Sequence, residues 1–310
     1  MEYSVLAYYF FTFIENPAAE VLRHKEFFST RDIRGRIYLS QEGINGQMSC
    51  PAPLAQEYME WLRSDPRFKE IEFKIHTWTE HCFPRATVKV RPQLVALDTQ
   101  VNLSKIGVHL SPEEWKAKLD ARDEKTALID VRNQYEWNIG RFEGAELPKL
   151  EKFREFSAYA RELKTQYNPQ EAKVMMYCTG GIRCELYSAL MREEGFDHVY
   201  QLQGGVIKYG LHVGSKHWKG RLFVFDDRLS VPISEKDPAE IISHCTRCPT
   251  LTDAYFNCAN MDCNELFLSC PDCAEKTKGC CSTACGNAPR IRPYHKQDRP
   301  KPFRRLSHLF

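Results

Sequence analysis

The sequence predicts a mixed α/β chain: an α+β N-terminal domain, a central α/β domain with a parallel sheet, and a cysteine-rich C-terminal segment. In the first part, strand and helix signals follow one another in the order βαββαβ, whereas in the second part strands alternate with helices, which is typical of a parallel sheet. Nine of the 13 cysteines lie between Cys245 and Cys285. We expect domains at residues 1–98, 111–227 and 240–289, with a basic tail at 290–310.

The N-terminal domain is predicted from its hydrophobic runs and turn residues. We expect strands at 3–13, 35–40 and 71–75, the last with an extension at 86–90, and helices at 18–29 and 54–64. A further strand follows the turn Gln41-Glu-Gly-Ile-Asn-Gly46, in which Asn45-Gly46 is the strongest hairpin signal of the chain. This order predicts a ferredoxin-like sandwich of one antiparallel sheet and two helices.

The central domain begins where Ser111 precedes the helical segment Pro-Glu-Glu-Trp, because Glu114 stands at the third helical position and completes a capping box. Strands are expected at 126–130, 173–177 and 198–202, separated by helices. The carboxyl ends of parallel strands meet at one edge of a sheet, so the loops after them should gather there. We expect three polar residues near the end of the first of these strands to form an ion-paired support of this edge: Asp130, Arg132 and Glu136.

A thiol site is predicted where Cys178 begins the segment CTGGIRC, between the strand at 173–177 and a helix at 184–194. A sulfur there faces consecutive backbone N–H groups and the positive end of a helix, so its thiolate is favoured and its pKa should fall. Glycines let the N–H groups turn inward and form a nest for a thiolate or persulfide anion, and an arginine adds positive charge. The loop-binding residues are Thr179, Gly180, Gly181, Ile182 and Arg183. A buried structural cysteine is the alternative, and the loop composition favours the reactive thiol.

Two interpretations of Cys184 remain open: a helix-start residue packed against the sheet, or a resolving thiol that closes a disulfide with Cys178. The phosphatase loop is a related arrangement, but it has its arginine six residues after the cysteine, and Arg183 follows Cys178 by five. The shorter loop favours sulfur chemistry over phosphate chemistry.

Residues 122–221 contain the strand exit IDVR-x-x-x-E, the turn GxxxGA, the cysteine loop and the segment QLxGG. With these motifs, the stretch resembles a rhodanese domain. The resemblance implies a doubly wound parallel sheet and a persulfide carried on Cys178, supplied by a sulfur donor protein or small molecule.

The cysteine-rich segment has the spacing of a zinc-binding segment. Two CxxC pairs about twenty residues apart let each pair of sulfurs reach one ion. A segment with so few apolar residues needs a metal to fold, so the zinc would be structural. Nine sulfurs could serve two sites with one to spare, or one site and several free thiols. The candidate ligands are Cys245, Cys248, Cys258, Cys263, Cys270, Cys273, Cys280, Cys281 and Cys285.

The charge of the chain is uneven, because residues 290–310 hold seven Lys or Arg and one acid. Such a tail suits a flexible arm along a phosphate backbone, and a solvated tail without a partner is the alternative. The candidate RNA-binding residues are Arg290, Arg292, Lys296, Arg299, Lys301, Arg304 and Arg305. The sequence has no run of eighteen apolar residues and no signal-peptide pattern at its start, so we expect a cytoplasmic protein without a membrane partner.

Five motifs are spread along the chain: EGING, RGRIY, CTGGIRCE, GGVIKYG and FVFDDR. On these motifs, nearly the whole chain resembles the bacterial tRNA wobble-uridine hydroxylase family, with an acylphosphatase-like N-terminal domain. The resemblance implies that Cys178 is essential and that molecular oxygen and an unidentified reductant convert the wobble uridine of tRNA to 5-hydroxyuridine. Two alternatives remain: a sulfurtransferase that carries a persulfide from thiosulfate or for tRNA thiolation, and a non-catalytic RNA-binding module.

Overall fold

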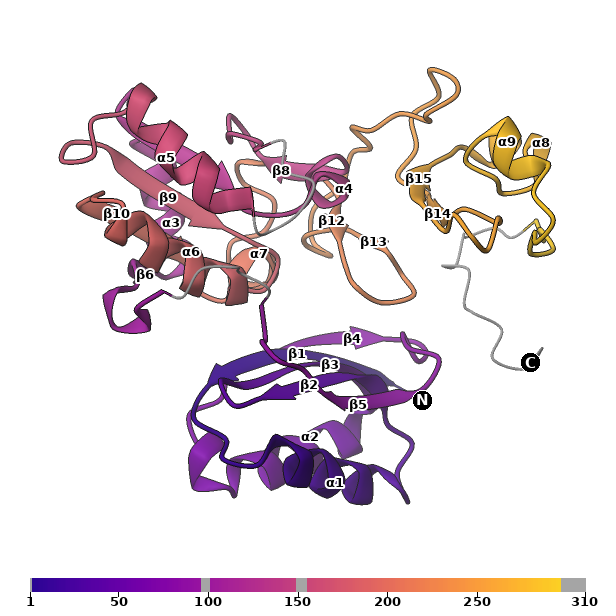
Figure 1. Ribbon diagram of the computed structural model, residues 1–310, viewed down its shortest axis with the longest axis horizontal. Helices are drawn as coiled ribbons and strands as arrows, with labels where there is room; N and C mark the ends of the chain where they lie inside the picture. Colours follow the sequence, from indigo (N-terminus) through magenta and orange to yellow (C-terminus); the bar gives the residue numbers. More distant parts are fainter. Residues whose placement is uncertain (1, 96–100, 149–154, 297–310) are drawn as a thin grey trace.

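The computed structural model describes residues 2–95, 101–148 and 155–296, and every structural statement below refers to these ranges. Figure 1 shows the N-terminal domain below the central domain, with the cysteine-rich segment beside the central domain. Among the helices of the described ranges, none combines the length and the apolar character needed to cross a bilayer.

The N-terminal domain is the expected α/β sandwich, with one additional strand. Its five strands form one sheet in the order β4-β1-β3-β2-β5, and both long helices cover the same face of it (Figure 1). The elements are β1 (Tyr3–Phe11), α1 (Pro17–Phe28), β2 (Arg34–Ser40), β3 (Gly43–Pro51), α2 (Ala52–Arg63), the 3-10 turn η1 (Pro66–Phe68), β4 (Phe73–Trp78) and β5 (Ala86–Val90).

The extension expected at 86–90 is a separate fifth strand. β4 pairs with β1 at one edge of the sheet, whereas β5 pairs in parallel with β2 at the other edge, where Gly35 faces Ala86. A connection that crosses from one edge to the other cannot be a continuation of one strand. The sheet is therefore mixed, and the expectation of a purely antiparallel sheet was wrong.

Asn45-Gly46 does not form the predicted hairpin turn. Ser40 pairs with Gly43, so the turn between β2 and β3 is Gln41-Glu42, and Asn45 and Gly46 lie inside β3. Gly46 is required there for packing, because a Cβ would lie 2.2 Å from Cζ of Tyr8. A tertiary contact thus explains a glycine that the local sequence pattern assigns to a turn.

Alternation along the strands divides the N-terminal sheet into an apolar face and a polar face. Leu6, Ile37, Ile44 and Met48 belong to the core under the two helices, and none of them is exposed. Their neighbours in the chain must point to the opposite face, since successive strand residues alternate. That second face is directed toward the central domain (Figure 1).

The central domain has the expected parallel sheet, in the order β6-β10-β9-β7. One buried cluster packs under α5 and α6 and another under α3 and α7, so helices cover both faces. The predicted capping box of Ser111 and Glu114 is confirmed. The elements are η2 (Leu103–Lys105), β6 (Val108–Leu110), α3 (Pro112–Asp120), β7 (Thr126–Asp130), α4 (Gln134–Trp137), β8 (Gly140–Phe142), α5 (Phe156–Gln166), β9 (Lys173–Tyr177), α6 (Ile182–Glu193), β10 (His198–Leu202) and α7 (Gly205–His212).

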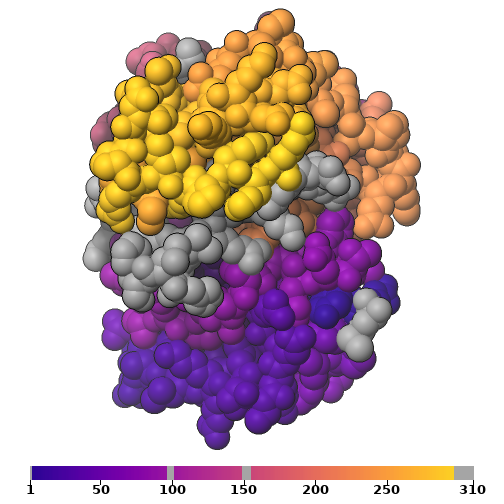
Figure 2. Space-filling model, turned by 90° about the vertical axis from the view of Figure 1, so that its right-hand side faces the viewer, coloured from indigo at the N-terminus to yellow at the C-terminus, as the bar shows by residue number. Residues whose placement is uncertain are grey.

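The remaining chain forms short strand pairs and two short helices. Tyr255 and Leu268 join Ile139 and Phe223 in one buried cluster, and the Tyr255 hydroxyl donates to the carbonyl of Tyr135 at 2.8 Å. The cysteine-rich segment is thereby fixed to the central domain. Figure 2 shows the molecule from the side on which this segment lies, and there the segment lies above the N-terminal domain. The elements are β11 (Trp218–Gly220), β12 (Leu222–Phe223), β13 (Ser230–Val231), β14 (Tyr255–Asn257), β15 (Leu266–Leu268), α8 (Pro271–Lys276) and α9 (Thr283–Gly286).

The packing of Gly46 yields the first testable prediction. In Gly46→Ala, the added methyl overlaps the Tyr8 ring, and relief of this overlap should cost about 1–3 kcal/mol of unfolding free energy. Urea unfolding of the purified variant measures the loss. Gly286→Ala is the control, because a Cβ there meets no atom within 4 Å. Equal unfolding midpoints for the two variants would contradict the assignment.

Candidate active site and metal centres

Cys178 lies at the carboxyl end of β9, directly before α6, and none of its surface is exposed. The backbone N–H of Gly181 donates to its sulfur at 3.1 Å, and Gly181 has a positive φ of 104°, which favours glycine. The start of α7 fixes this loop from the other side. Gly205 approaches it so closely that a Cβ would lie 2.6 Å from the Cys178 carbonyl oxygen.

The surroundings of Cys178 favour a thiolate. Burial by itself raises the pKa of this thiol, but several groups stabilise the anion: the Cys184 thiol, the charge of Arg183, and the backbone N–H groups of Arg183 and Gly181. Together they lower the pKa to about 5. Burial and the neighbouring anion raise the pKa of Cys184, so it stays a protonated donor beside the Cys178 sulfur.

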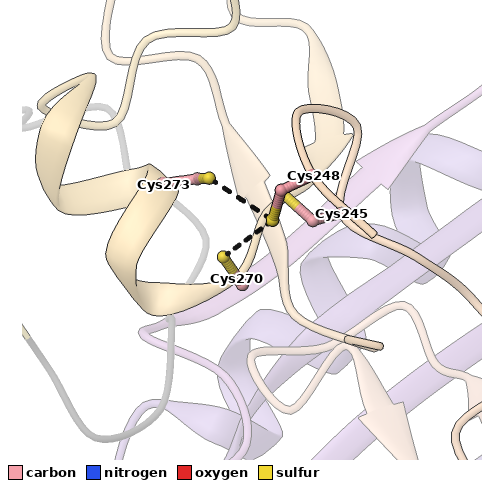
Figure 3. Close-up of side chains that lie close together, drawn as sticks. All are labelled: Cys245, Cys248, Cys270 and Cys273. Atoms are coloured by element: carbon pink, nitrogen blue, oxygen red, sulfur yellow. Dashed lines mark hydrogen bonds between the residues drawn. The ribbon is translucent and has the colours of Figure 1, made fainter. Parts of the chain in front are cut away.

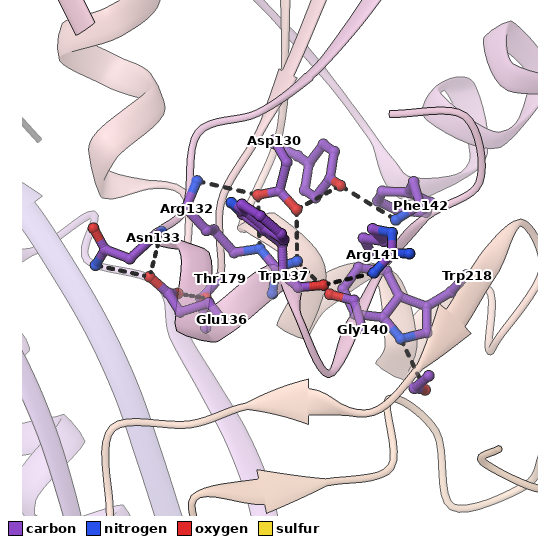
Figure 4. A network of polar contacts seen from close by, with 12 residues as sticks. Asp130, Arg132, Asn133, Glu136, Trp137, Gly140, Arg141, Phe142, Thr179 and Trp218 are labelled. Atoms are coloured by element: carbon purple, nitrogen blue, oxygen red, sulfur yellow. Dashed lines mark hydrogen bonds and ion pairs between the residues drawn. The ribbon is translucent and has the colours of Figure 1, made fainter. Parts of the chain in front are cut away.

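A buried carboxylate, that of Glu136, holds the arginine of the loop in place, and Figure 4 shows Glu136 in contact with Thr179 of the same loop. Both oxygens of Glu136 accept from the guanidinium of Arg183, at 2.6 and 2.7 Å, and the hydroxyl of Thr179 donates to the same carboxylate at 2.8 Å. Asp130 and Arg132 form the expected ion pair at the sheet edge, at 2.6 Å. Glu136 is not part of that pair, because its partner is the thiol loop.

The thiol loop and the polar face of the N-terminal sheet enclose a cavity of about 430 Å³. Cys178, Thr179, Ile182 and Arg183 line it from the central domain, and Asn133 and Phe225 contribute to its wall. The residues that line it from the N-terminal sheet include Tyr9, Arg36, Tyr38, Asn45, Gln47 and Lys74.

Polar contacts hold the two walls of this cavity together. The Tyr9 hydroxyl donates to Glu185 of α6 at 2.8 Å, and Lys208 of α7 pairs with Glu72 at 3.1 Å. Arg36 donates to the Phe225 carbonyl at 3.2 Å. The N-terminal domain is therefore part of the site, a contribution that sequence reasoning missed. A signal was available in the sequence: Ile44 and Met48 are apolar and belong to the core, whereas Asn45 and Gln47 alternate with them and are polar. This alternation indicates a second, polar face of the sheet.

The cysteines of the C-terminal segment gather into two groups of four. Cys245 and Cys248 come from a loop, and Cys270 and Cys273 from the start of α8, and the four point toward one another in Figure 3. Cys258, Cys263, Cys281 and Cys285 form the second group. Within each group all four sulfurs lie within 4.8 Å of one another. The ninth cysteine, Cys280, belongs to neither group and is buried in the small core of the segment.

The geometry of both groups fits a tetrahedral metal ion. Zn–S bonds of about 2.3 Å place the sulfurs of a tetrahedral site roughly 3.8 Å apart. The sulfur of Cys248 lies 3.6 Å from those of Cys270 and Cys273, and the sulfur of Cys281 lies 3.7 Å from those of Cys263 and Cys285. Each group can therefore hold one metal ion with four thiolate ligands.

Three of the candidate RNA-binding residues lie in the described ranges, and each contacts the cysteine-rich segment. Arg290 pairs with Asp262 and Lys296 with Glu275, both at 2.9 Å. Arg292 is buried and donates to the Cys258 carbonyl at 2.9 Å. Arg299, Lys301, Arg304 and Arg305 lie outside the described residues.

Comparison with known families divides the chain into three matching stretches. Residues 3–94 match the UPF0176 acylphosphatase like domain, residues 111–211 match the Rhodanese-like domain, and residues 219–286 match the family described as Rhodanase C-terminal. Among solved structures, a rhodanese-like domain from Anabaena is 19% identical with a TM-score of 0.31, covering 44% of this chain and 87% of that chain. The expected fold class is confirmed by the family matches of residues 3–94 and 111–211 and by the topology described above.

Curated relatives match over nearly the whole chain. The tRNA uridine(34) hydroxylase of Protochlamydia amoebophila is 58% identical over 306 residues, which cover 99% of this chain and 95% of the relative. The protein of the same name from Chlamydia muridarum is 55% identical over 304 residues, covering 98% of this chain and 92% of the relative. Identity of this extent, over all three parts of the molecule, shows that the chain belongs to the tRNA uridine(34) hydroxylase family.

Proposed function

We propose that this chain is an enzyme that hydroxylates uridine 34 of tRNA to 5-hydroxyuridine, with Cys178 as its catalytic residue. The observation that carries the proposal is a buried, acidic thiol that lines a cavity between two domains. The relatives with this name cover the same two domains. Molecular oxygen and a reductant are the proposed cosubstrates, because hydroxylation adds an oxygen atom to carbon, and the cytoplasm is the proposed location.

The cavity has the dimensions for one unstacked base. A volume of about 430 Å³ is sufficient for a single nucleoside. Enzymes that act on a base extrude it into a pocket, and a base of a single-stranded loop costs the least to extrude. Position 34 lies in the anticodon loop of tRNA, which suits this requirement. Arg183, held by Glu136 beside the thiol, would keep the sulfur anionic while the base enters.

Binding of the remaining tRNA would use positive charge outside the cavity. Of the seven basic residues in the tail, Arg299, Lys301, Arg304 and Arg305 are the proposed phosphate contacts. Long-range attraction to phosphates needs charge and little fixed geometry. Arg290, Arg292 and Lys296 hold the cysteine-rich segment together by the contacts described above, so their contribution to RNA affinity would be smaller.

A second candidate function is sulfur carriage on Cys178. The match of residues 111–211 to the Rhodanese-like domain favours it, and the backbone donor at the Cys178 sulfur would suit the terminal sulfur of a persulfide. Mass spectrometry of protein incubated with thiosulfate distinguishes the two functions. A sulfur adduct on Cys178 without oxygen-dependent change in tRNA would favour the sulfurtransferase.

We also propose that each group of four cysteines holds one structural zinc ion. Thiolate ligands in a closed tetrahedral set are typical of structural zinc. The hydrophobic core of the segment has only six buried residues, among them Phe256, Phe267 and Ala274. Binding of the ions would supply stability that so small a core does not.

The proposed function has a direct test. Purified protein, with a reductant and in air, should add one oxygen atom to uridine 34 of a tRNA transcript, as detected by nucleoside mass spectrometry. Cys178→Ser should abolish the product because a serine hydroxyl is not ionised at neutral pH. A transcript with cytidine 34 is the substrate control. Full activity of Cys178→Ser would refute the assignment of Cys178.

The pKa of Cys178 predicts how its reactivity depends on pH. Only the thiolate reacts with iodoacetamide, so the rate of labelling should fall as pH drops through about 5 and stay constant above neutrality. Cys184→Ala removes the donor beside the sulfur and should move this transition upward by about one pH unit or more. Cys184→Ser, which keeps a donor, is the matched control. Mass spectrometry of the Cys178 peptide measures the rate, and identical transitions in both variants would contradict the proposed role of Cys184.

The metal sites predict a zinc content of two ions per chain. Cys270→Ser should reduce the content to one ion, and Cys280→Ser should leave both ions in place because Cys280 lies in neither group. Elemental analysis of the purified variants gives the ratio of metal to protein. Loss of an ion from Cys280→Ser would show that the ligand sets are wrong.

A further inference from the structure

Lys74 is a largely buried cation in the cavity wall, next to the Tyr9 ring. It lies on β4, only 7% of its surface is exposed, and it lines the same cavity as Cys178. Its ammonium lies 4.8 Å from the centroid of the Tyr9 ring. Within the described residues it has no hydrogen-bond acceptor and no ion-pair partner. An ammonium group without a partner is costly to bury, so its position indicates an anionic or strongly polar ligand.

The charge of Lys74 persists at neutral pH. Burial lowers the pKa of this lysine to about 8, while the Cys178 thiolate and the carboxylates of Glu72 and Glu185 act in the opposite direction. The cavity therefore holds a cation and a thiolate on opposite walls, one from each domain. A ligand between them meets a nucleophile, the Cys178 thiolate, on one side and a cationic hydrogen-bond donor, the Lys74 ammonium, on the other.

Two amide side chains of the same sheet face define the shape of a fitting ligand. Asn45 and Gln47 line the cavity from β3, and no hydrogen bond to either side-chain amide occurs among the residues that the structure describes. An amide offers one acceptor and one donor group, which together match an N–H next to a carbonyl. The edge of a uracil ring has this pattern, since its N3–H stands between two carbonyl oxygens.

We propose that Lys74 is a catalytic residue that donates a hydrogen bond to O4 of the uracil ring while the Cys178 thiolate adds to C6. The proposal rests on the proposed function, and it names the chemical step that the cavity performs on the base. A cation at position 4 of the ring also explains a preference for uracil. Cytosine has an amino group there, which is a donor and would meet the ammonium group unfavourably.

The step is an addition whose charge Lys74 stabilises. A lone pair of the Cys178 sulfur forms the S–C6 bond, the C5=C6 electron pair moves to C4–C5, and the C4=O4 pair moves onto O4. The product is an enolate with its negative charge on O4, opposite the ammonium group. A preorganised donor aimed at charge that develops in the reaction stabilises the transition state. C5 of this enolate is electron-rich, and it is the carbon that the proposed hydroxylation modifies.

The addition can be observed without oxygen, because the enolate exchanges its C5 hydrogen with solvent. In D₂O, C5 takes up one deuteron, the original proton leaves, and the C5=C6 pair re-forms as the thiolate departs. The experiment incubates tRNA with the full-length protein under nitrogen in D₂O and measures deuterium at uridine 34 by mass spectrometry. The same preparation is assayed for hydroxylation in air with a reductant.

Exchange should occur with the wild-type protein and vanish in Cys178→Ser. Lys74→Met should slow it by about 100-fold, whereas Lys74→Arg should restore part of the rate because it returns a charged donor. Lys89→Met is the control, since Lys89 is an exposed lysine on β5 of the same sheet. Affinity for tRNA should change by less than about threefold in both methionine variants.

Three outcomes would be decisive against parts of this scheme. Exchange at the wild-type rate in Lys74→Met overturns the role of Lys74. Hydroxylation in air without exchange under nitrogen overturns the addition step and leaves the proposed function intact. Exchange under nitrogen without any hydroxylation in air supports the addition and overturns the proposed function.

Discussion

The arrangement of this molecule depends on keeping a negative sulfur inside the protein. Cys178 has no exposed surface, and burial of an unpaired charge would cost several kcal/mol. The cost is offset by groups from several elements: backbone N–H groups of the loop, the Cys184 thiol, and the Arg183 guanidinium. Arg183 is itself buried and needs Glu136 from α4. One anion thus fixes the positions of the loop, the start of α6 and the helix that supplies the carboxylate.

The second domain of the site is needed because the thiol loop provides only one wall. The N-terminal sheet covers its apolar face with helices and directs its polar face toward the thiol, as the alternation of Ile44, Asn45 and Gln47 shows. A cavity between two domains gives the sulfur a low-dielectric surrounding and leaves a volume of about 430 Å³ beside it. The contact of Tyr9 with Glu185 and the pair of Lys208 with Glu72 keep the walls in register.

Patterns of neighbouring residues predicted the structural features that depend mainly on neighbouring residues. The thiol loop, the capping box at Ser111 and the parallel sheet follow from spacing and residue type, and the structure has all three.

Contacts between residues far apart in the chain could not be predicted from such patterns. Asn45-Gly46 was assigned to a turn from its residue types alone. The neighbouring sequence does not show that the Tyr8 ring occupies the space in which a side chain at position 46 would lie. The position of Lys74 in the cavity was missed for the same reason, since β4 and the thiol loop are about a hundred residues apart and meet only in the folded protein. Glu136 was assigned to the ion-paired edge of the sheet with Asp130 and Arg132. Its arginine partner is Arg183, which lies in the thiol loop.

The hydrogen bond between Tyr255 and Tyr135 connects the cysteine-rich segment with the surroundings of Cys178. Tyr255 belongs to the cysteine-rich segment, and Tyr135 is the immediate neighbour of Glu136 in α4. The same two regions share a hydrophobic cluster through Leu268 and Ile139. These contacts of the cysteine-rich segment restrict the position of α4, the short helix that carries Glu136, the counter-ion of Arg183. Oxidation of the distal cysteines would therefore act on the reactive thiol through Tyr255, Tyr135, Glu136 and Arg183, although Cys178 lies in another domain.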